Sequence, residues 1–417
     1  MAHLAIAGGT PQRQNPYPSW PIWTQEEVDA VQAVVTSGRW ISLQGTEVSK
    51  FETEFAAYHD AAYGIAVVNG TVALKLALTA AGVGVGDEVL MPAYTFVTTA
   101  TAALEIGAVP VFADIDPETY TIDPAHAATR ITPRTRAIVP VHLSGRPADM
   151  DAMLDLAQQH NLMVIEDAAQ AWGSEWNGAK VGALGHIGGI SFQASKNITA
   201  GEGGMMLTND PAMGDMARSL SNCGRQPEGL WYAHYVLGGN YRLSEFQGAV
   251  LRVQLQRYPE HLEQRQANAA YLERSLAEID GISTMRSDAR VTANAYHLFF
   301  MRYDADAFGG ASKARFIQAM QAEGIQGVNG GYSLPVYRQP VMQAKNFGLA
   351  TPPLFHGVHP NPPDYRQVAL PATDRACDHE AVWLRQSMLL GNRQDMDDIV
   401  EAILKIQRYR DELLQDQ

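Results

Sequence analysis

Short apolar runs alternate with amphipathic segments of helical length through the first half of the chain. The runs lie at 65–68, 88–91, 110–113, 137–141, 163–166, 189–192 and 204–207. Helical periodicity fills intervals between them, as at 71–81 and 150–160. Strands that are buried on both faces have continuous apolar sequences. The alternation therefore predicts βα repeats and an α/β domain with a mainly parallel sheet.

The pattern changes after Arg242. Helical periodicity extends over 244–279, a strand-like run follows at 297–302, and further helices are predicted at 312–323 and 395–414. We therefore expect residues 1–243 to form an N-terminal segment and a large α/β domain, and residues 244–417 to form a smaller α+β domain. Residues 324–372 are rich in Gly, Pro, Tyr and His, and a loop of this length is typically a lid or a binding loop.

Charge and cysteine content narrow the possible partners and compartments. The formal net charge is −14, and no block of Lys or Arg compensates it. This balance argues against nucleic acid and anionic membranes as partners. Cys223 and Cys377 are the only cysteines and show no CxxC spacing. With no signal peptide and no apolar stretch of membrane-spanning length, we expect a cytoplasmic protein without a disulfide framework.

The strongest chemical motif runs from Ser191 to Lys196 as SFQASK and is followed by GEGG at 201–204. It places a lysine just after a buried strand, where loops at the carboxyl ends of strands form active sites in α/β folds. A lysine whose pKa is lowered by desolvation can form an imine with an aldehyde. A solvent-exposed lysine is the usual alternative for an isolated motif, but the neighbouring motifs favour the imine.

A second motif, VIEDAAQ at 164–170, is an apolar strand that ends in a carboxylate. Pyridoxal 5'-phosphate (PLP) acts as an electron sink while its ring nitrogen is protonated, and Asp167 is suited to hold that proton. Small side chains at Ala168 and Ala169 leave room for a flat ring, and Gln170 is within reach of its phenolic oxygen. The alternative for Asp167 is a helix N-cap, and the motif alone leaves both interpretations open.

A third motif, Asn69-Gly70-Thr71, lies between a strand and a helix. The free N–H groups and dipole of a helix start bind phosphate, although an ordinary helix cap has the same sequence. The chain contains no GxxxxGK[ST] motif, which argues against nucleoside triphosphate chemistry.

Two further segments contain residue types that suit a flat, phosphorylated ligand. Phe96, at the end of PAYTF, offers an aromatic face, with core packing as the alternative. Asn240 and Arg242, within GNYRL, place an amide beside a cation, with a solvated arginine as the alternative.

Taken in order, these motifs resemble the DegT/DnrJ/StrS family of sugar aminotransferases. The shared pattern is D-x-A-(H/Q), then S-F-x-x-x-K followed by G-E-G-G, then G-x-N-x-R, and the resemblance spans nearly the whole chain. It implies the aspartate-aminotransferase architecture (PLP fold type I), PLP as cofactor and a homodimer. No metal is expected, because His142, His356 and His359 lack the spacing of metal ligands on one element.

The resemblance also implies roles for individual residues. It makes Lys196 the Schiff-base lysine and Asp167 the partner of the ring nitrogen. The remaining implied contacts are Phe96 and Ala169 on the two ring faces, Gln170 at the phenolic oxygen, Gly70, Thr71 and Ser191 at the phosphate, and Asn240, with Arg242 nearby, reaching the phosphate from the other subunit.

The implied reaction transfers the amino group of L-glutamate or L-glutamine to a keto-sugar or keto-cyclitol, with Lys196 as general base. Gln193 stands where many sugar-nucleotide members have His, and Ser144 where an aromatic residue is common. The GGTPQR start and the segment from Cys377 to Gly391 resemble the keto-cyclitol branch and 3-amino-5-hydroxybenzoate synthase. A dehydrating or aromatising PLP enzyme and a non-catalytic regulatory protein are the alternatives, and Lys196 argues against dehydratases that replace this lysine with His.

Overall fold

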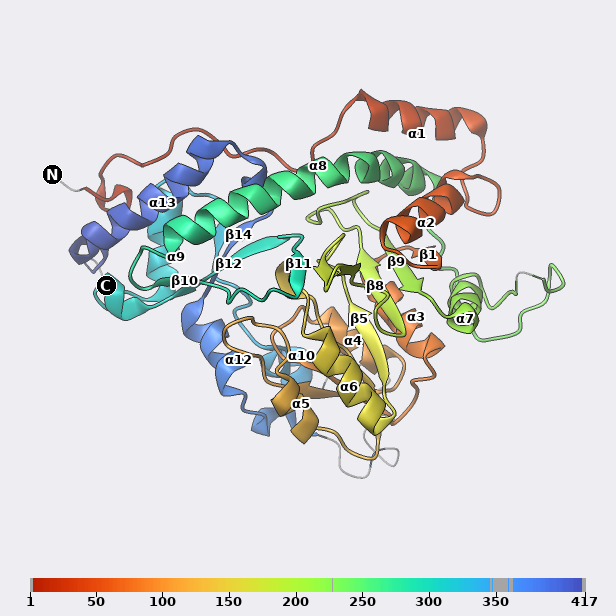
Figure 1. The fold of residues 1–417 in the computed structure, drawn as a ribbon. Coiled ribbons are helices and arrows are strands. Elements are labelled where there is room, and N and C mark those ends of the chain that lie inside the picture. The colour runs from red at the N-terminus through yellow and green to blue at the C-terminus, as the bar shows by residue number, and fades with distance from the viewer. Residues whose placement is uncertain (1–2, 227, 346, 348–358, 360–362, 415–417) are drawn as a thin grey trace.

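The computed structural model describes residues 3–226, 228–345, 347, 359 and 363–414, and a seven-stranded sheet forms its centre (Figure 1). Every apolar run of the first half forms one of its strands. These are β1 (Tyr63–Val67), β2 (Glu88–Pro92), β3 (Val109–Ala113), β4 (Thr135–Ile138), β5 (Met163–Asp167), β8 (Ile187–Ser191) and β9 (Gly204–Thr208). Their order is β1-β9-β8-β5-β4-β2-β3. Strand β9 is antiparallel to both neighbours and the other pairs are parallel, which confirms the α/β fold with a mainly parallel sheet.

Helices cover both faces of this sheet because successive strand residues point to opposite sides. Strand residues such as Ile65, Val89 and Ile165 pack with α3 (Gly70–Ala80), α4 (Thr98–Glu105) and α7 (Pro211–Ser221). Their neighbours, such as Ala66 and Leu90, pack with α2 (Glu47–Tyr58), α5 (Pro124–Thr129), α6 (Met150–His160) and the first half of α8 (Glu245–Leu276). Helix α1 (Gln25–Ser37) lies along α8 (Figure 1).

A four-stranded antiparallel sheet follows in the second half of the chain. Its order is β10 (Ile282–Thr284), β12 (Leu298–Tyr303), β14 (Ala381–Arg385) and β13 (Val328–Asn329). Helices α9 (Lys313–Ala322) and α13 (Arg393–Arg408) pack with it in one hydrophobic cluster. A small third sheet joins β11 (Val291–Ala293) to β6 (Glu175–Trp176) and β7 (Ala179–Lys180).

The last helix differs from the expected 395–414. It begins at Arg393, because Asn392 caps it by accepting a hydrogen bond from the Asp395 N–H, and it ends at Arg408. A separate 3₁₀ turn covers Arg410–Leu413. No helix of the described residues combines the length and apolarity that a bilayer crossing requires.

The N-terminal segment and part of the 324–372 segment pack outside the expected domain order. Leu4 is buried in the cluster of the four-stranded sheet, and Arg13 forms ion pairs of 2.6 Å with both Asp395 and Asp398 of α13. Conversely, Val336 and Tyr365 pack onto the seven-stranded sheet. The division at residue 243 stays a prediction.

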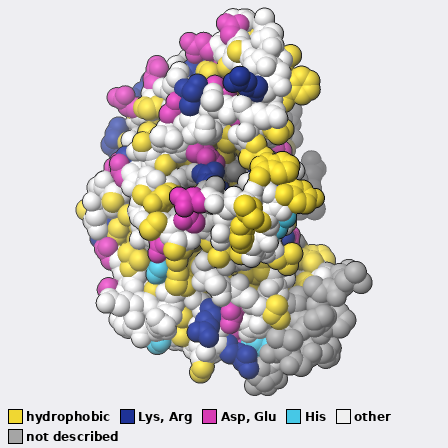
Figure 2. Space-filling model, turned by 90° about the vertical axis from the view of Figure 1, so that its right-hand side faces the viewer, with side chains coloured by type: hydrophobic (Ala, Val, Ile, Leu, Met, Phe, Trp, Pro, Cys, Tyr) yellow, Lys and Arg dark blue, Asp and Glu magenta, His cyan; other side chains and the backbone are white. Residues whose placement is uncertain are grey.

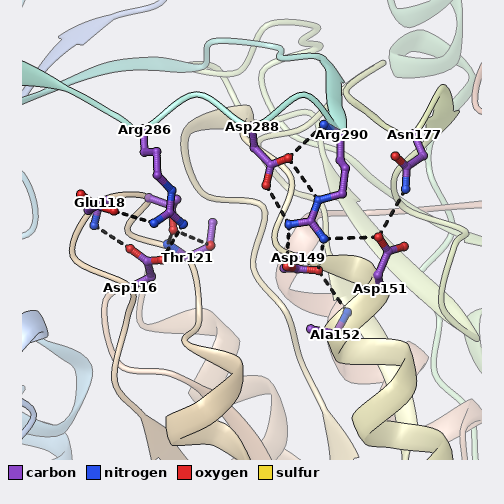
Figure 3. A network of polar contacts seen from close by, with 11 residues as sticks. Asp116, Glu118, Thr121, Asp149, Asp151, Ala152, Asn177, Arg286, Asp288 and Arg290 are labelled. Atoms are coloured by element: carbon purple, nitrogen blue, oxygen red, sulfur yellow. Dashed lines mark hydrogen bonds and ion pairs between the residues drawn. The ribbon is translucent and has the colours of Figure 1, made fainter.

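Two arginines tie the segment before β11 to the large sheet (Figure 3). Arg286 binds the turn after β3, and Arg290 binds the first turn of α6. Because Arg290 has several carboxylate partners at once, this network is a stronger link than isolated surface pairs. The acceptors are Asp116 and Glu118 for Arg286, and Asp149, Asp151 and Asp288 for Arg290.

Candidate active site

The lysine motif and the aspartate motif meet at one edge of the sheet. Strands β5 and β8 are parallel neighbours, so their carboxyl ends lie side by side. Asp167 ends β5, and Lys196 lies in a turn after β8 that is closed by a 2.8 Å hydrogen bond from its N–H to the Gln193 carbonyl. Burial lowers the pKa of Lys196 to about 8, against the opposing attraction of Asp167. An amine with this pKa is partly neutral near pH 7 and can attack an aldehyde.

The Asp167 carboxylate is buried and held in a fixed position. Burial raises the pKa of Asp167, and this is opposed chiefly by the hydrogen bond from Thr99, then by the one from the Ala169 N–H and by the charge of Lys196. The Thr99 hydroxyl donates to Oδ2 at 2.7 Å, and the Ala169 N–H donates to Oδ1 at 3.2 Å. Asp167 therefore caps a turn, not a helix, and its charge still acts on Lys196.

Several residues that lie around Lys196 belong to no motif of the sequence. The Lys196 Nζ lies 5.9 Å from the centre of the fully buried Trp172 ring. His297, from the second half of the chain, lies near the lysine, because its Nδ1 is 3.2 Å from the Asn197 Oδ1 and its ring is 5.7 Å from the Trp172 ring. Burial and the charge of Lys196 hold the pKa of His297 well below its usual value. Asn197 joins the two halves, because its Nδ2 donates to the Ala295 carbonyl at 2.8 Å. No local motif marks these residues, since each depends on tertiary contacts.

A fully buried pair, His142 and Glu166, lies behind Asp167. The His142 Nδ1 accepts from the Ala148 N–H at 3.0 Å, so its Nε2 donates to the Glu166 carboxylate at 2.9 Å. Burial alone would raise the pKa of Glu166, but hydrogen bonds from His142 and two backbone N–H groups lower it. The pair therefore holds the loop that follows β4 against strand β5.

The histidines considered as metal ligands have other partners in this structure. His142 binds Glu166, His359 binds Glu88 at 2.9 Å, and His356 lies outside the described residues. Within the described part of the chain, no group of three or more His, Cys, Asp or Glu side chains could hold a metal ion.

Gln170 is fixed at both ends of its amide. Its Oε1 accepts from the Ser144 N–H at 2.7 Å, and its Nε2 donates to the Tyr332 hydroxyl at 3.3 Å. Ser144 has a φ of 61°, so the loop adopts a left-handed turn to present this N–H. Tyr332 comes from the 324–372 segment that the sequence marks as a binding loop.

The first turn of α3 forms a cradle against β8. Asn69 caps the helix by accepting from the Val72 N–H at 2.9 Å. A Cβ added to Gly70 would lie 2.7 Å from the Ser191 Cβ, so only glycine allows this approach. The N–H groups of Gly70 and Thr71 donate to no acceptor among the described residues. Such a helix start is suited to an anionic group such as phosphate.

Three residues of the predicted site form no hydrogen bond or ion pair with Lys196 or Asp167 among the described residues of this single chain. The Phe96 ring is 55% exposed in the turn before α4. Asn240 is exposed, and Arg242 donates to the Asn222 Oδ1 of its own chain at 2.8 Å. Their roles stay predictions.

The chemical groups gathered at this site are those that PLP binding requires. The site combines a desolvated lysine, a buried carboxylate whose charge acts on that lysine, and a glycine-lined helix start with unused N–H groups. These are the groups that an aldehyde, a pyridine nitrogen and a phosphate require.

Comparison with curated proteins agrees with this chemistry. The chain is 36% identical over 428 residues to the L-glutamine:2-deoxy-scyllo-inosose aminotransferase of Streptoalloteichus tenebrarius, with 99% of each chain covered. It is 41% identical over 288 residues to the 3-amino-5-hydroxybenzoate synthase of Amycolatopsis mediterranei, which covers 69% of this chain and 74% of the relative.

Solved structures of the same architecture also match. The crystal structure of 3-amino-5-hydroxybenzoic acid synthase superimposes with a TM-score of 0.84 at 33% identity, covering 95% of this chain and 99% of the other. DesI, solved in the presence of its TDP-sugar product, matches with a TM-score of 0.80 at 27% identity over 98% of this chain and 96% of its own. The family model described as the DegT/DnrJ/EryC1/StrS aminotransferase family matches residues 21–354. The chain therefore belongs to the DegT/DnrJ/EryC1/StrS aminotransferase family, and it is an aminotransferase.

Proposed function

We propose that this aminotransferase uses PLP to transfer the amino group of L-glutamine to a keto-cyclitol. The observation that carries the proposal is the desolvated Lys196 amine, with a pKa of about 8, beside the buried Asp167 carboxylate. The substrates are taken from the full-length relative that is named for L-glutamine and 2-deoxy-scyllo-inosose. L-glutamate as donor and a keto-sugar as acceptor are the nearest variants.

PLP, when bound, supplies an electron sink for the carbon that loses its proton. Lys196 would hold the aldehyde carbon of PLP, and its freed amine would take the proton from the α carbon of the donor. Asp167 would keep the ring nitrogen protonated. The overall exchange converts L-glutamine and a ketone to 2-oxoglutaramate and an amine, so no external oxidant or reductant is consumed.

The other predicted residues would bind and orient the cofactor. The helix start at Gly70 and Thr71, with Ser191, would hold the phosphate. Gln170 would present its Nε2 to the phenolic oxygen, because the Ser144 N–H occupies its Oε1. Phe96 and Ala169 would lie on the two ring faces.

We propose a homodimer in which Asn240 and Arg242 complete the phosphate site of the other subunit. The loop between α7 and α8 projects from the molecule, and Figure 2 views this side, where hydrophobic side chains gather at the surface. Its Trp231 and Leu237 are 79% and 98% exposed. Apolar groups exposed to this degree favour burial against a second copy. The free state of both cysteines supports a cytoplasmic location.

The identity to 3-amino-5-hydroxybenzoate synthase supports a second candidate, an aromatising PLP enzyme. This candidate keeps the lysine and differs only in the product. Mass spectrometry of the product from each ketone separates the two, because an aromatic product shows the loss of water that amino transfer alone does not cause.

The direct test of the proposal is a borohydride experiment followed by a substrate screen. The purified protein should absorb visible light, and borohydride should bleach it and fix the cofactor on Lys196. L-glutamine with 2-deoxy-scyllo-inosose should then give an amino-cyclitol. A peptide map that places the reduced adduct on Lys75 or Lys180 would refute the site, and the absence of turnover with every keto-cyclitol would refute the substrate class.

A further inference from the structure

Tyr332 reaches the candidate site from the second half of the chain along a constrained path. It follows β13, and Gly331 before it has a φ of +74°. A Cβ at Gly331 would lie 2.5 Å from the Tyr94 hydroxyl and 2.9 Å from the Ala381 Cβ, so glycine is required there. The backbone therefore fixes where the Tyr332 side chain begins.

Aromatic neighbours then fix the direction of the Tyr332 ring. It packs edge to face against Tyr94, at 5.3 Å between ring centres, and against Trp383, at 5.1 Å. Aromatic pairs in this geometry are favourable beyond their buried area. The hydroxyl group is thus held at a set position and is not free to swing into solvent.

The hydroxyl has one unused hydrogen-bond donor. A backbone N–H can only donate, so the Ser144 contact identifies the other end of the Gln170 amide as its NH₂ group. The Tyr332 oxygen consequently accepts from Gln170, and its own proton finds no acceptor among the described residues. Burial also raises the pKa of Tyr332, so this proton is retained at neutral pH.

The position of this donor relates it to the reacting lysine. Tyr332 is hydrogen-bonded to Gln170, three residues after Asp167, and Asp167 ends the strand beside the one that leads to the Lys196 turn. A phenol and a carboxamide are neutral hydrogen-bonding groups, which suit the hydroxyl groups of a polyol. A carboxylate would instead favour a cationic partner such as arginine.

We propose that Tyr332 is a specificity-determining residue that donates a hydrogen bond to a ring hydroxyl of the keto acceptor. This inference rests on the proposed function and deepens it, because it assigns one side chain to the acceptor and not to the amino donor. A site built to bond a hydroxyl discriminates strongly against a ligand that lacks it.

The test compares Tyr332→Phe with Tyr94→Phe in the PLP-loaded protein. Both variants remove a phenol from the same aromatic cluster, but the Tyr94 hydroxyl meets the Tyr332 backbone and no side-chain hydrogen-bond partner among the described residues, so its loss should leave both half-reactions within about twofold. In the unaltered protein, L-glutamine alone should remove the visible absorbance, and the ketone alone should restore it to the amine-loaded protein. In Tyr332→Phe the acceptor half-reaction should lose about ten- to a hundred-fold in kcat/KM, with the donor half-reaction within about twofold.

A set of keto-cyclitols that each lack one hydroxyl sharpens the test. One of them should be processed equally by the unaltered protein and by Tyr332→Phe, because its missing group is the one that Tyr332 binds. Calorimetric binding of the amine product should weaken by a similar factor in Tyr332→Phe. Equal losses in both half-reactions would mean that Tyr332 only holds Gln170, and a shifted resting absorbance would mean that it contacts PLP; either result overturns the proposal.

Failure of the proposed function gives a different result. The donor half-reaction needs no ketone, so its absence in the unaltered protein would refute the use of L-glutamine. Product binding would still decide the inference on Tyr332, since it requires no turnover. Unchanged binding in Tyr332→Phe, with a normal melting temperature, would overturn it.

Discussion

Lys196 shows how the fold changes the chemistry of a single side chain. Burial lowers its pKa to about 8, so the neutral amine that attacks an aldehyde becomes abundant two to three pH units earlier than for an exposed lysine. In the cofactor-free protein, the rate of PLP capture should therefore rise with pH and reach half its maximum near pH 8. Stopped-flow absorbance measures this, and Lys196→Ala should show no imine absorbance at any pH. A midpoint near 10.5 would contradict the buried environment.

Thr99 offers a test of the Asp167 environment that leaves the carboxylate in place. Its hydroxyl lowers the pKa of Asp167, so Thr99→Val should raise that pKa further. The charged form of Asp167 is then lost at a higher pH, and the acidic limb of the kcat profile should move upward in pH. We expect kcat to fall by about tenfold, equivalent to about 1.4 kcal/mol. Thr53→Val, an exposed helical threonine, is the matched control and should leave the profile unchanged.

Asp167 itself gives a stronger effect. Asp167→Ala and Asp167→Asn should both fold, as judged by circular dichroism, yet lose activity by orders of magnitude, because an unprotonated pyridine is a poor electron sink. Near-normal turnover in either variant would reduce Asp167 to the cap of the 168–170 turn.

For single residues, the sequence predicts a role only where the residues that mark the role are close along the chain. Lys196 and Asp167 follow apolar strands, and both stand at one sheet edge in the structure. Thr99 and Tyr332 depend on partners 68 and 162 residues away, so no local pattern marks them. Ser144 is recognised in the sequence as unusual, but only the structure shows that its backbone N–H, not its side chain, orients Gln170.

Helix α3 is the element that matters most for the proposed phosphate site, because its first turn forms that site. Gly70→Ala would place a methyl group 2.7 Å from the Ser191 Cβ, which cannot rotate away. We expect the helix start to shift from β8, with about 1 to 3 kcal/mol lost in stability and weaker PLP binding. Gly84→Ala is the control, because its Cβ would meet open space. Thermal melting and PLP titration measure both effects, and a Gly70→Ala protein with unchanged PLP affinity would contradict the phosphate site.

Elements of the large sheet were predictable because each strand overlaps a run of mostly apolar residues that is bounded by segments of helical length. Strands β10 and β13 contain three and two residues, which is too short for any periodicity. Strand β14 is long enough, but it directly follows a π-helical turn at Ala376–Glu380 and has no flanking turn signal. The second domain was therefore recognised by its helices and by β12 alone.

The whole molecule is tied together by its N-terminal segment as well as by α8. Arg13 pairs with α13, and the Trp20 Nε1 donates at 2.9 Å to the Ala194 carbonyl, within the turn that carries Lys196. A segment that the sequence assigns to the large domain thus contacts both the lysine turn and the last helix. Such contacts arise only from tertiary packing, which explains why composition and periodicity did not predict them.

The sharing of active sites between subunits is the property of the whole molecule that most needs an experiment. If Asn240 and Arg242 reach the phosphate of the other subunit, each site needs Lys196 from one chain and Asn240 from its partner. Lys196→Ala and Asn240→Ala/Arg242→Ala chains, each inactive alone, should then complement one another after dissociation and remixing. Random pairing makes about half of the dimers mixed, and each mixed dimer holds one intact site, so roughly a quarter of the sites should recover.

The control for this experiment mixes each variant with itself under the same conditions, with dimer formation followed by light scattering. The contrary outcome has a specific structural meaning. Arg242 already binds Asn222 of its own chain, and its backbone pairs with Val67 at the end of β1, three residues before Gly70. If mixed dimers form without any gain in activity, Asn240 and Arg242 serve the site of their own chain, and the loop between α7 and α8 contributes only apolar contacts to the dimer.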